Sequence, residues 1–137
     1  MHSTHSPDAR ATLDELCESA VRRGLAGVCF TEHVEFDPSD AAYGYINYES
    51  YLSDVHRCRD RYGDRLEIKA GVEVTYQRKY VDDIRRFLDT RRFDYVLGSV
   101  HSIDHIFVGS PAYFAGKSEA EACEPYWRET MSMLKSG

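Results

Sequence analysis

Hydrophobic residues recur at intervals of three and four in four segments of the chain, which is the spacing of amphipathic helices. The first segment covers residues 12–24 and the second residues 48–63, and each closes on a glycine. A third segment begins at about Tyr80, and the last begins after Ser118. Thr12 and Ser118 each stand three residues before a glutamate, which is the capping box that starts many helices.

Between these segments lie three short apolar runs that predict β-strands at residues 26–31, 66–74 and 95–100. In the second run every other residue is apolar, which places Glu73 on the opposite face. Residues 103–117 are predicted to be a loop. Strands that alternate with helices form parallel sheets with right-handed crossovers, so the pattern predicts the α/β class. Three strands are too few to close a barrel.

Composition narrows the possible functions. The chain has 137 residues, enough for one domain, with a net charge of −6 and no basic run, which argues against binding to nucleic acid or an anionic membrane surface. No stretch approaches the ~20 apolar residues of a transmembrane helix. The cysteines form no CxxC pair, and we interpret them as thiols of a cytoplasmic protein: Cys17, Cys29, Cys58 and Cys123.

Each predicted strand runs into a residue that can bind metal or carry a proton. His33 follows the first strand, Glu73 ends the second, and His101 follows the third. The carboxyl ends of parallel strands share one edge, where α/β proteins carry their chemistry. Singly, each residue has a more ordinary interpretation as a loop histidine or a paired surface glutamate. Together with the histidines and aspartate of residues 2–8, they predict a polynuclear site whose nitrogen and oxygen ligands suit zinc, manganese or iron.

Four segments resemble the first motifs of the PHP (polymerase and histidinol phosphatase) superfamily, and most closely its histidinol-phosphatase branch: His2–Asp8, Phe30–His33, Gly71–Val74 and Gly98–Ser102. The resemblance implies a distorted, TIM-like (β/α)7 barrel, of which this chain is about the first half. It also implies a site of three divalent metal ions. By this resemblance the metal ligands are His2, Asp8, His33, Glu73 and His101. Glu73 bridges two ions, and Glu73 and His101 are also the catalytic residues.

The sequence departs from the family pattern at both ends. The family opens on His-x-His, and this chain begins at the intervening residue. The resemblance places another histidine and an Asp-x-His pair beyond Gly137. We therefore expect residues 1–137 to be an incomplete PHP domain that lacks the first strand and the carboxyl-terminal half. Such a domain is expected to be inactive alone.

The activity implied by the resemblance is metal-dependent hydrolysis of a phosphomonoester. The expected substrate is L-histidinol phosphate, which yields L-histidinol and phosphate in histidine biosynthesis. Two alternatives stay open: a phosphoesterase acting on another small phosphate ester, and a metal-binding PHP module without turnover. Three acidic residues are candidates to hold the substrate's ammonium or imidazole, although a solvated loop is the commoner role: Glu35, Asp37 and Asp40. Three histidines are interpreted as non-ligands: His5, His56 and His105.

Overall fold

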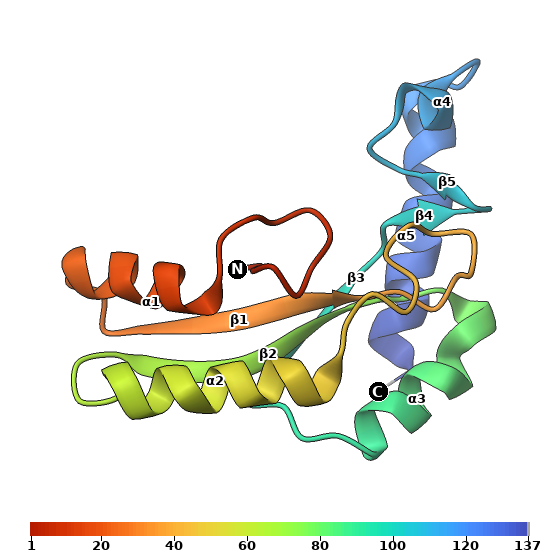
Figure 1. The fold of residues 1–137 in the computed structure, drawn as a ribbon. Coiled ribbons are helices and arrows are strands. Elements are labelled where there is room, and N and C mark those ends of the chain that lie inside the picture. Colours follow the sequence, from red (N-terminus) through yellow and green to blue (C-terminus); the bar gives the residue numbers. More distant parts are fainter. Residues whose placement is uncertain (137) are drawn as a thin grey trace.

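The computed structural model describes residues 1–136, and the helices and main strands follow the predicted order (Figure 1). The elements are α1 (Leu13–Arg22), β1 (Gly27–Val34), α2 (Tyr48–Tyr62), β2 (Glu67–Thr75), the 3₁₀ turn η1 (Arg78–Tyr80), α3 (Val81–Asp89), β3 (Tyr95–Ser99), β4 (Ser102–Ile103), β5 (Ile106–Phe107), α4 (Pro111–Phe114) and α5 (Glu119–Lys135). Both predicted capping boxes are present, at Thr12 and Ser118. In the described residues no helix is both long enough and apolar enough to cross a membrane.

The main sheet has three parallel strands in the order β1-β2-β3, as the alternation of helices and strands predicted. Its register places His33 of β1 beside Glu73 of β2, and Glu73 beside Leu97 of β3. Residues paired across parallel strands point to the same face. The sheet therefore presents His33, Glu73 and Leu97 on one face and leaves the other to the helices.

The helix-covered face of β1 and β2 carries the larger hydrophobic core. Figure 1 shows α1 and α2 running alongside these two strands, at the end of the molecule away from α4. Their buried side chains form one cluster that includes Leu13, Phe30, Tyr51, Val55 and Ile68. The Tyr51 hydroxyl lies within hydrogen-bonding distance of the Phe30 and Gly71 carbonyl oxygens, at 3.0 and 2.9 Å. Helix α2 is thereby attached to both strands.

A smaller core joins β2 to α3 and α5. It contains Val72, Val74 and Ile84, with Met133 of α5 packed against it. Several large apolar side chains near this core are exposed, on β3 (Tyr95 and Val96) and on α5 (Trp127, Met131 and Leu134). The outer side of the molecule at β3 and α5 is therefore only partly packed.

Two predictions about element boundaries are wrong. Strand β1 continues to Val34, so that His33 lies within the strand and not after it. Residues 103–117, predicted to be a loop, contain helix α4 and most of a hairpin in which β4 pairs with β5. The hairpin turns at Asp104 and His105, which both have positive φ, at 49° and 64°. Glycine and asparagine are the strongest signals of such a turn, and the pair Asp-His is a weaker one, so the hairpin was not predicted.

Candidate metal centre

The loop of residues 2–8 is held in place by a buried glutamate on β1. Glu32 is fully buried, and its carboxylate accepts hydrogen bonds from the Ser3 backbone N–H at 3.0 and 3.1 Å. The Ser3 and Ser6 hydroxyls also donate to it, at 2.7 and 2.6 Å. A buried carboxylate with this many donors is well satisfied. Glu32 therefore positions the loop that carries His2 and Asp8.

Two of the predicted site residues, His2 and His101, lie beside the carboxylate of a third, Glu73. Its Oε1 lies 3.0 Å from His101 Nε2, and its Oε2 lies 3.6 Å from His2 Nε2. The two carboxylate oxygens thus face different histidines, one from the amino-terminal loop and one just after β3. A carboxylate that joins two metal ions presents its oxygens in this way.

The other two predicted residues complete the cluster. His33 Nε2 lies 3.3 Å from Asp8 Oδ2. The His33 ring stacks on His2, with centroids 4.1 Å apart, and meets His101 edge-on at 5.1 Å. The structure therefore brings His2, Asp8, His33, Glu73 and His101 together at one edge of the sheet. Their roles as ligands and catalytic groups stay predictions.

Glu35 and Thr75 also lie at this site, and the sequence reasoning did not assign them to the metal centre. His101 Nδ1 lies 3.0 Å from Glu35 Oε1 and 2.6 Å from Thr75 Oγ1, and the Thr75 hydroxyl donates to the same Glu35 oxygen. The hydrogen bond to Glu35, with the charges of Glu35 and Glu73, raises the pKa of His101 above its ordinary value, against the opposing effect of burial. Alternation along the strands was the missed signal, because Glu35 stands two residues after His33 and Thr75 two after Glu73.

The donor atoms fit a divalent metal site. Two sets of residues offer ligand atoms within 4.8 Å of one another: His2, Asp8 and His33, and His33, Glu35 and His101. Three buried atoms in these sets have no hydrogen-bond partner within residues 1–136: His2 Nδ1, His33 Nδ1 and Glu35 Oε2. Buried polar atoms are rarely left unpaired without a functional reason. Imidazole nitrogens and carboxylate oxygens without thiolates suit zinc, manganese or iron.

The remaining histidines lie outside the cluster. His5 Nε2 is 2.9 Å from Asp54 Oδ2 and links the amino-terminal loop to α2. His56 is exposed on α2. His105 Nδ1 is 2.7 Å from Asp37 Oδ2 and ties the β4–β5 hairpin to the segment that follows β1. None of the three belongs to a group of potential metal ligands in the described residues.

A cavity of about 350 Å³ opens beside the cluster. His33, Glu35 and His101 line it together with Asp8, Asp40 and the apolar Phe107. Asp37 does not line it, and its carboxylate accepts hydrogen bonds from the Ser39 backbone and hydroxyl. Burial alone raises the pKa of Asp37, but these hydrogen bonds and the charges of Lys79 and His105 hold it below its usual range. Of the three acidic candidates, Glu35 and Asp40 are therefore placed to meet a small molecule.

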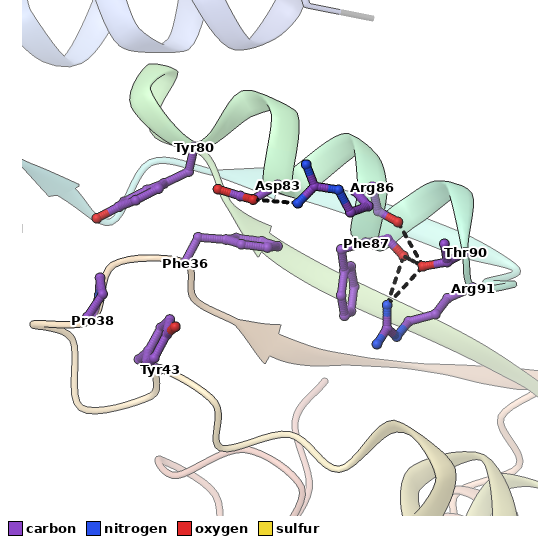
Figure 2. Close-up of a pocket in the computed structure, with 9 residues that line it drawn as sticks. All are labelled: Phe36, Pro38, Tyr43, Tyr80, Asp83, Arg86, Phe87, Thr90 and Arg91. Atoms are coloured by element: carbon purple, nitrogen blue, oxygen red, sulfur yellow. Dashed lines mark hydrogen bonds and ion pairs between the residues drawn. The ribbon is translucent and has the colours of Figure 1, made fainter.

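A second cavity, of about 480 Å³, lies between α3 and the segment after β1 (Figure 2). Figure 2 shows the Phe36 and Phe87 rings beside each other, and they meet edge to face with centroids 5.8 Å apart and an interplanar angle of 83°. Its charged groups have partners: Arg86 donates to Asp83 at 2.9 Å, and Arg91 donates to Thr90 Oγ1 at 3.1 Å. Among the residues that the structure describes, no histidine lines this cavity, so it lacks the imidazole ligands of the cluster.

Comparison with known families identifies the family to which this chain belongs. The family model "PHP domain" matches residues 1–136. The chain belongs to the PHP domain family. This agrees with the resemblance seen in the four motifs and confirms the predicted fold class.

Two PHP relatives are histidinol-phosphatases. The protein from Lactococcus lactis subsp. lactis (strain IL1403) is 29% identical over 136 residues, which is 98% of this chain and 50% of that protein. The protein from Bacillus subtilis (strain 168) is 32% identical over 87 residues, which is 58% of this chain and 32% of that protein. The chain thus spans about half the length, or less, of the curated PHP relatives that it matches.

A solved PHP structure shows the same fold. It is the crystal structure of histidinol phosphate phosphatase from Lactococcus lactis, in complex with zinc, L-histidinol and phosphate. The TM-score is 0.88 at 27% sequence identity, over 98% of this chain and 51% of that chain. The sheet and helices of residues 1–136 therefore correspond to about half of that PHP enzyme.

Proposed function

We propose that this PHP chain contributes to a metal-dependent phosphomonoesterase that converts L-histidinol phosphate to L-histidinol and phosphate, in the cytoplasm and in histidine biosynthesis. The observation that carries the proposal is the position of Glu73, whose two oxygens face His101 and His2. The similarity to histidinol-phosphatases of bacteria supports the substrate. That residues 1–137 form an incomplete PHP domain stays a prediction.

Five side chains would hold the ions: His2, Asp8, His33, Glu73 and His101. Divalent ions at such a site lower the pKa of a bound water and neutralise phosphoryl oxygens. The cavity beside the cluster has no lysine or arginine in its lining, so the described residues there supply no cation for the phosphate. Within this chain, the metal-binding residues are therefore the ones that meet the phosphate end of the substrate.

The other end of the substrate carries an ammonium and an imidazole. Asp40 lines the cavity and offers carboxylate oxygens, whereas Glu35, which also lines it, is engaged by His101 and Thr75. Phe107 and Ala41 add apolar surface to the same cavity. We assign Asp40, Ala41 and Phe107 to the binding of the histidinol moiety.

The test compares Glu73→Gln with Glu67→Gln. The two residues lie on the same face of β2, but Glu67 is exposed and pairs with Lys69. Binding of Zn²⁺ and Mn²⁺ is measured by competition with a chromophoric chelator. Glu73→Gln keeps the side-chain shape and removes the bridging charge, so we expect metal affinity to fall at least about tenfold. Glu67→Gln is expected to bind metal as the unchanged chain does.

Phosphate release from L-histidinol phosphate is measured in parallel, in residues 1–137 and in any longer protein that contains them. We expect little or no turnover from residues 1–137, since the family resemblance places further ligands outside them, both before Met1 and beyond Gly137. In a longer, active protein, Glu73→Gln should abolish turnover. Near-normal turnover by this variant with its metals loaded would contradict the proposal. Hydrolysis of other phosphate esters but not of L-histidinol phosphate would support the first alternative, and metal binding without any turnover the second.

A further inference from the structure

His101 is the one histidine of the cluster whose two ring nitrogens both have partners among the described residues. Nε2 faces Glu73 Oε1, and Nδ1 faces Glu35 Oε1, each at 3.0 Å. His2 and His33, by contrast, each have a buried Nδ1 without a partner. The His101 ring is therefore held from both sides, by carboxylates of two different chain segments.

The geometry points to Glu35 and Thr75 as positioning residues that fix the His101 ring and its tautomer, so that Nε2 is presented to a metal ion shared with Glu73. The inference rests on the proposed function, because it assigns these two residues to its metal centre. A neutral imidazole carries one proton, and a metal binds the nitrogen without it. Glu35 accepts a hydrogen bond from the N–H at Nδ1, which keeps the proton on Nδ1 and leaves the Nε2 lone pair directed toward Glu73.

Thr75 adds a second contact on the same nitrogen. Its hydroxyl donates to Glu35 Oε1, and its oxygen lies 2.6 Å from His101 Nδ1. Because the Thr75 hydroxyl donates its hydrogen bond to Glu35, its oxygen is free to accept a hydrogen bond from the N–H at Nδ1 of His101. Thr75 is buried on β2, two residues after Glu73 and on the same face. One strand thus supplies both the carboxylate near Nε2 and a hydroxyl that orients Nδ1.

The burial of Glu35 is an independent observation. Its side chain is only 4% exposed, yet no lysine or arginine pairs with it among the described residues, and its Oε2 has no partner. A buried carboxylate is costly unless cationic groups or donors compensate it. Here the donors are His101 and Thr75, and a positive charge on the cluster would complete the compensation. Carboxylates behind metal-binding histidines act in this way and raise the basicity of the ring.

The experiment uses three variants of the chain, with Zn²⁺ as the probe. Glu35→Gln keeps the shape and removes the charge, Thr75→Val removes the hydroxyl, and Thr75→Ser restores it. We expect Glu35→Gln to lower Zn²⁺ affinity about 10- to 100-fold, the usual effect of losing such an outer contact. Thr75→Val is expected to lower it less, and Thr75→Ser to bind as the unchanged chain does. Thermal melting without metal checks that each variant folds.

A second readout is the ¹⁵N NMR spectrum of the histidine side chains with Zn²⁺ bound. We expect His101 to be bound through Nε2 and protonated at Nδ1, and Thr75→Val to broaden or shift the Nδ1 signal. Binding through Nδ1 would overturn the inference. So would the loss of one bound ion per chain in Glu35→Gln, since that would make Glu35 a ligand. Affinities of Glu35→Gln and Thr75→Val within twofold of the unchanged chain would overturn this inference alone, whereas no Zn²⁺ binding by the unchanged chain would overturn the proposed function as well.

Discussion

The two sides of the sheet's helical cover differ in how completely they are packed. Beside β1 and β2, the helices α1 and α2 enclose a cluster in which Phe30, Tyr51 and Val55 are fully buried. Beside β3, Tyr95 and Val96 are about half exposed, and α5 leaves Trp127 59% exposed. Hydrophobic burial is the main source of folding free energy. The β1–β2 side therefore supplies most of the stability of this chain.

The candidate metal centre spans both sides. His2, Asp8 and His33 belong to β1 and the loop that Glu32 holds, whereas His101 follows the less packed β3. Glu73 lies between them on β2, the central strand. The geometry of the candidate site therefore depends on the less packed side of the sheet as well as on the more packed one. His101 is held by Thr75 of β2 and by Glu35, which follows β1, so the contacts that fix its ring come from outside the less packed side.

The largest expected contrast comes from truncating one aromatic residue on each side. Phe30→Ala should lower the free energy of unfolding by about 3–5 kcal/mol, because it leaves a cavity in the closed core. Trp127→Ala removes an exposed ring and should change it by less than about 0.5 kcal/mol. Urea unfolding followed by circular dichroism measures both. Equal losses would show that the two sides are packed alike in solution.

A smaller contrast concerns two glutamates. Glu32→Gln places an amide among the donors of Ser3 and Ser6, and the Ser3 backbone N–H cannot turn away. The expected loss of unfolding free energy is about 1–3 kcal/mol, the cost of an unsatisfied buried group. Glu67→Gln, at a side chain 67% exposed, is the matched control and should cost less than about 0.5 kcal/mol. An unchanged melt for Glu32→Gln would show that the loop is not held by this carboxylate.

The smallest perturbation is chemical labelling of the thiols, which leaves the fold unchanged. All four cysteines are free; Cys17 and Cys58 are buried on the β1–β2 side, and Cys123 is exposed on α5. Burial raises the pKa of Cys17 to about 12 and also raises the pKa of Cys58. The thiolate is the reactive form, so at pH 8 Cys123 should react first with a disulfide reagent. Cys17 and Cys58 should react only on unfolding, and a fast phase that survives Cys123→Ser would contradict this.

The sequence predicted the main elements because their patterns are local. Capping at Thr12 and Ser118, and alternation in the strand that contains Glu73, need no knowledge of the fold. The β4–β5 hairpin was not predicted because its turn, at Asp104 and His105, contains no glycine or asparagine, although Asp and His adopt positive φ more often than most other non-glycine residues. The start of helix α4 is visible in the sequence, because Ser110 is a typical N-cap residue and Pro111 is favoured at the first helical position.

Within the site, the strand ends predicted which residues gather but not what holds them. The first strand was predicted to stop at Thr31, which placed Glu35 in a loop and hid its alternation with His33. Thr75 was hidden in the same way, one residue beyond the predicted end at Val74. The contact of both with His101 depends on tertiary structure, because His101 lies beyond β3 and its ring direction follows from no local pattern.

The joint between α2 and the two strands also limits how this sequence can drift over evolutionary time. A Cβ atom at Gly71 would lie 2.8 Å from both Cys29 Sγ and the Phe30 carbonyl oxygen, so any larger residue there forces the strands apart. The Gly71 carbonyl oxygen is also a partner of the Tyr51 hydroxyl. Replacing Tyr51 by phenylalanine would leave two carbonyl oxygens without this donor. Enlarging residue 71 would need both a smaller residue 29 and a shift of the β1 backbone at Phe30. Few single substitutions at residues 51 and 71 are therefore expected to leave the packing of α2 on the two strands unchanged.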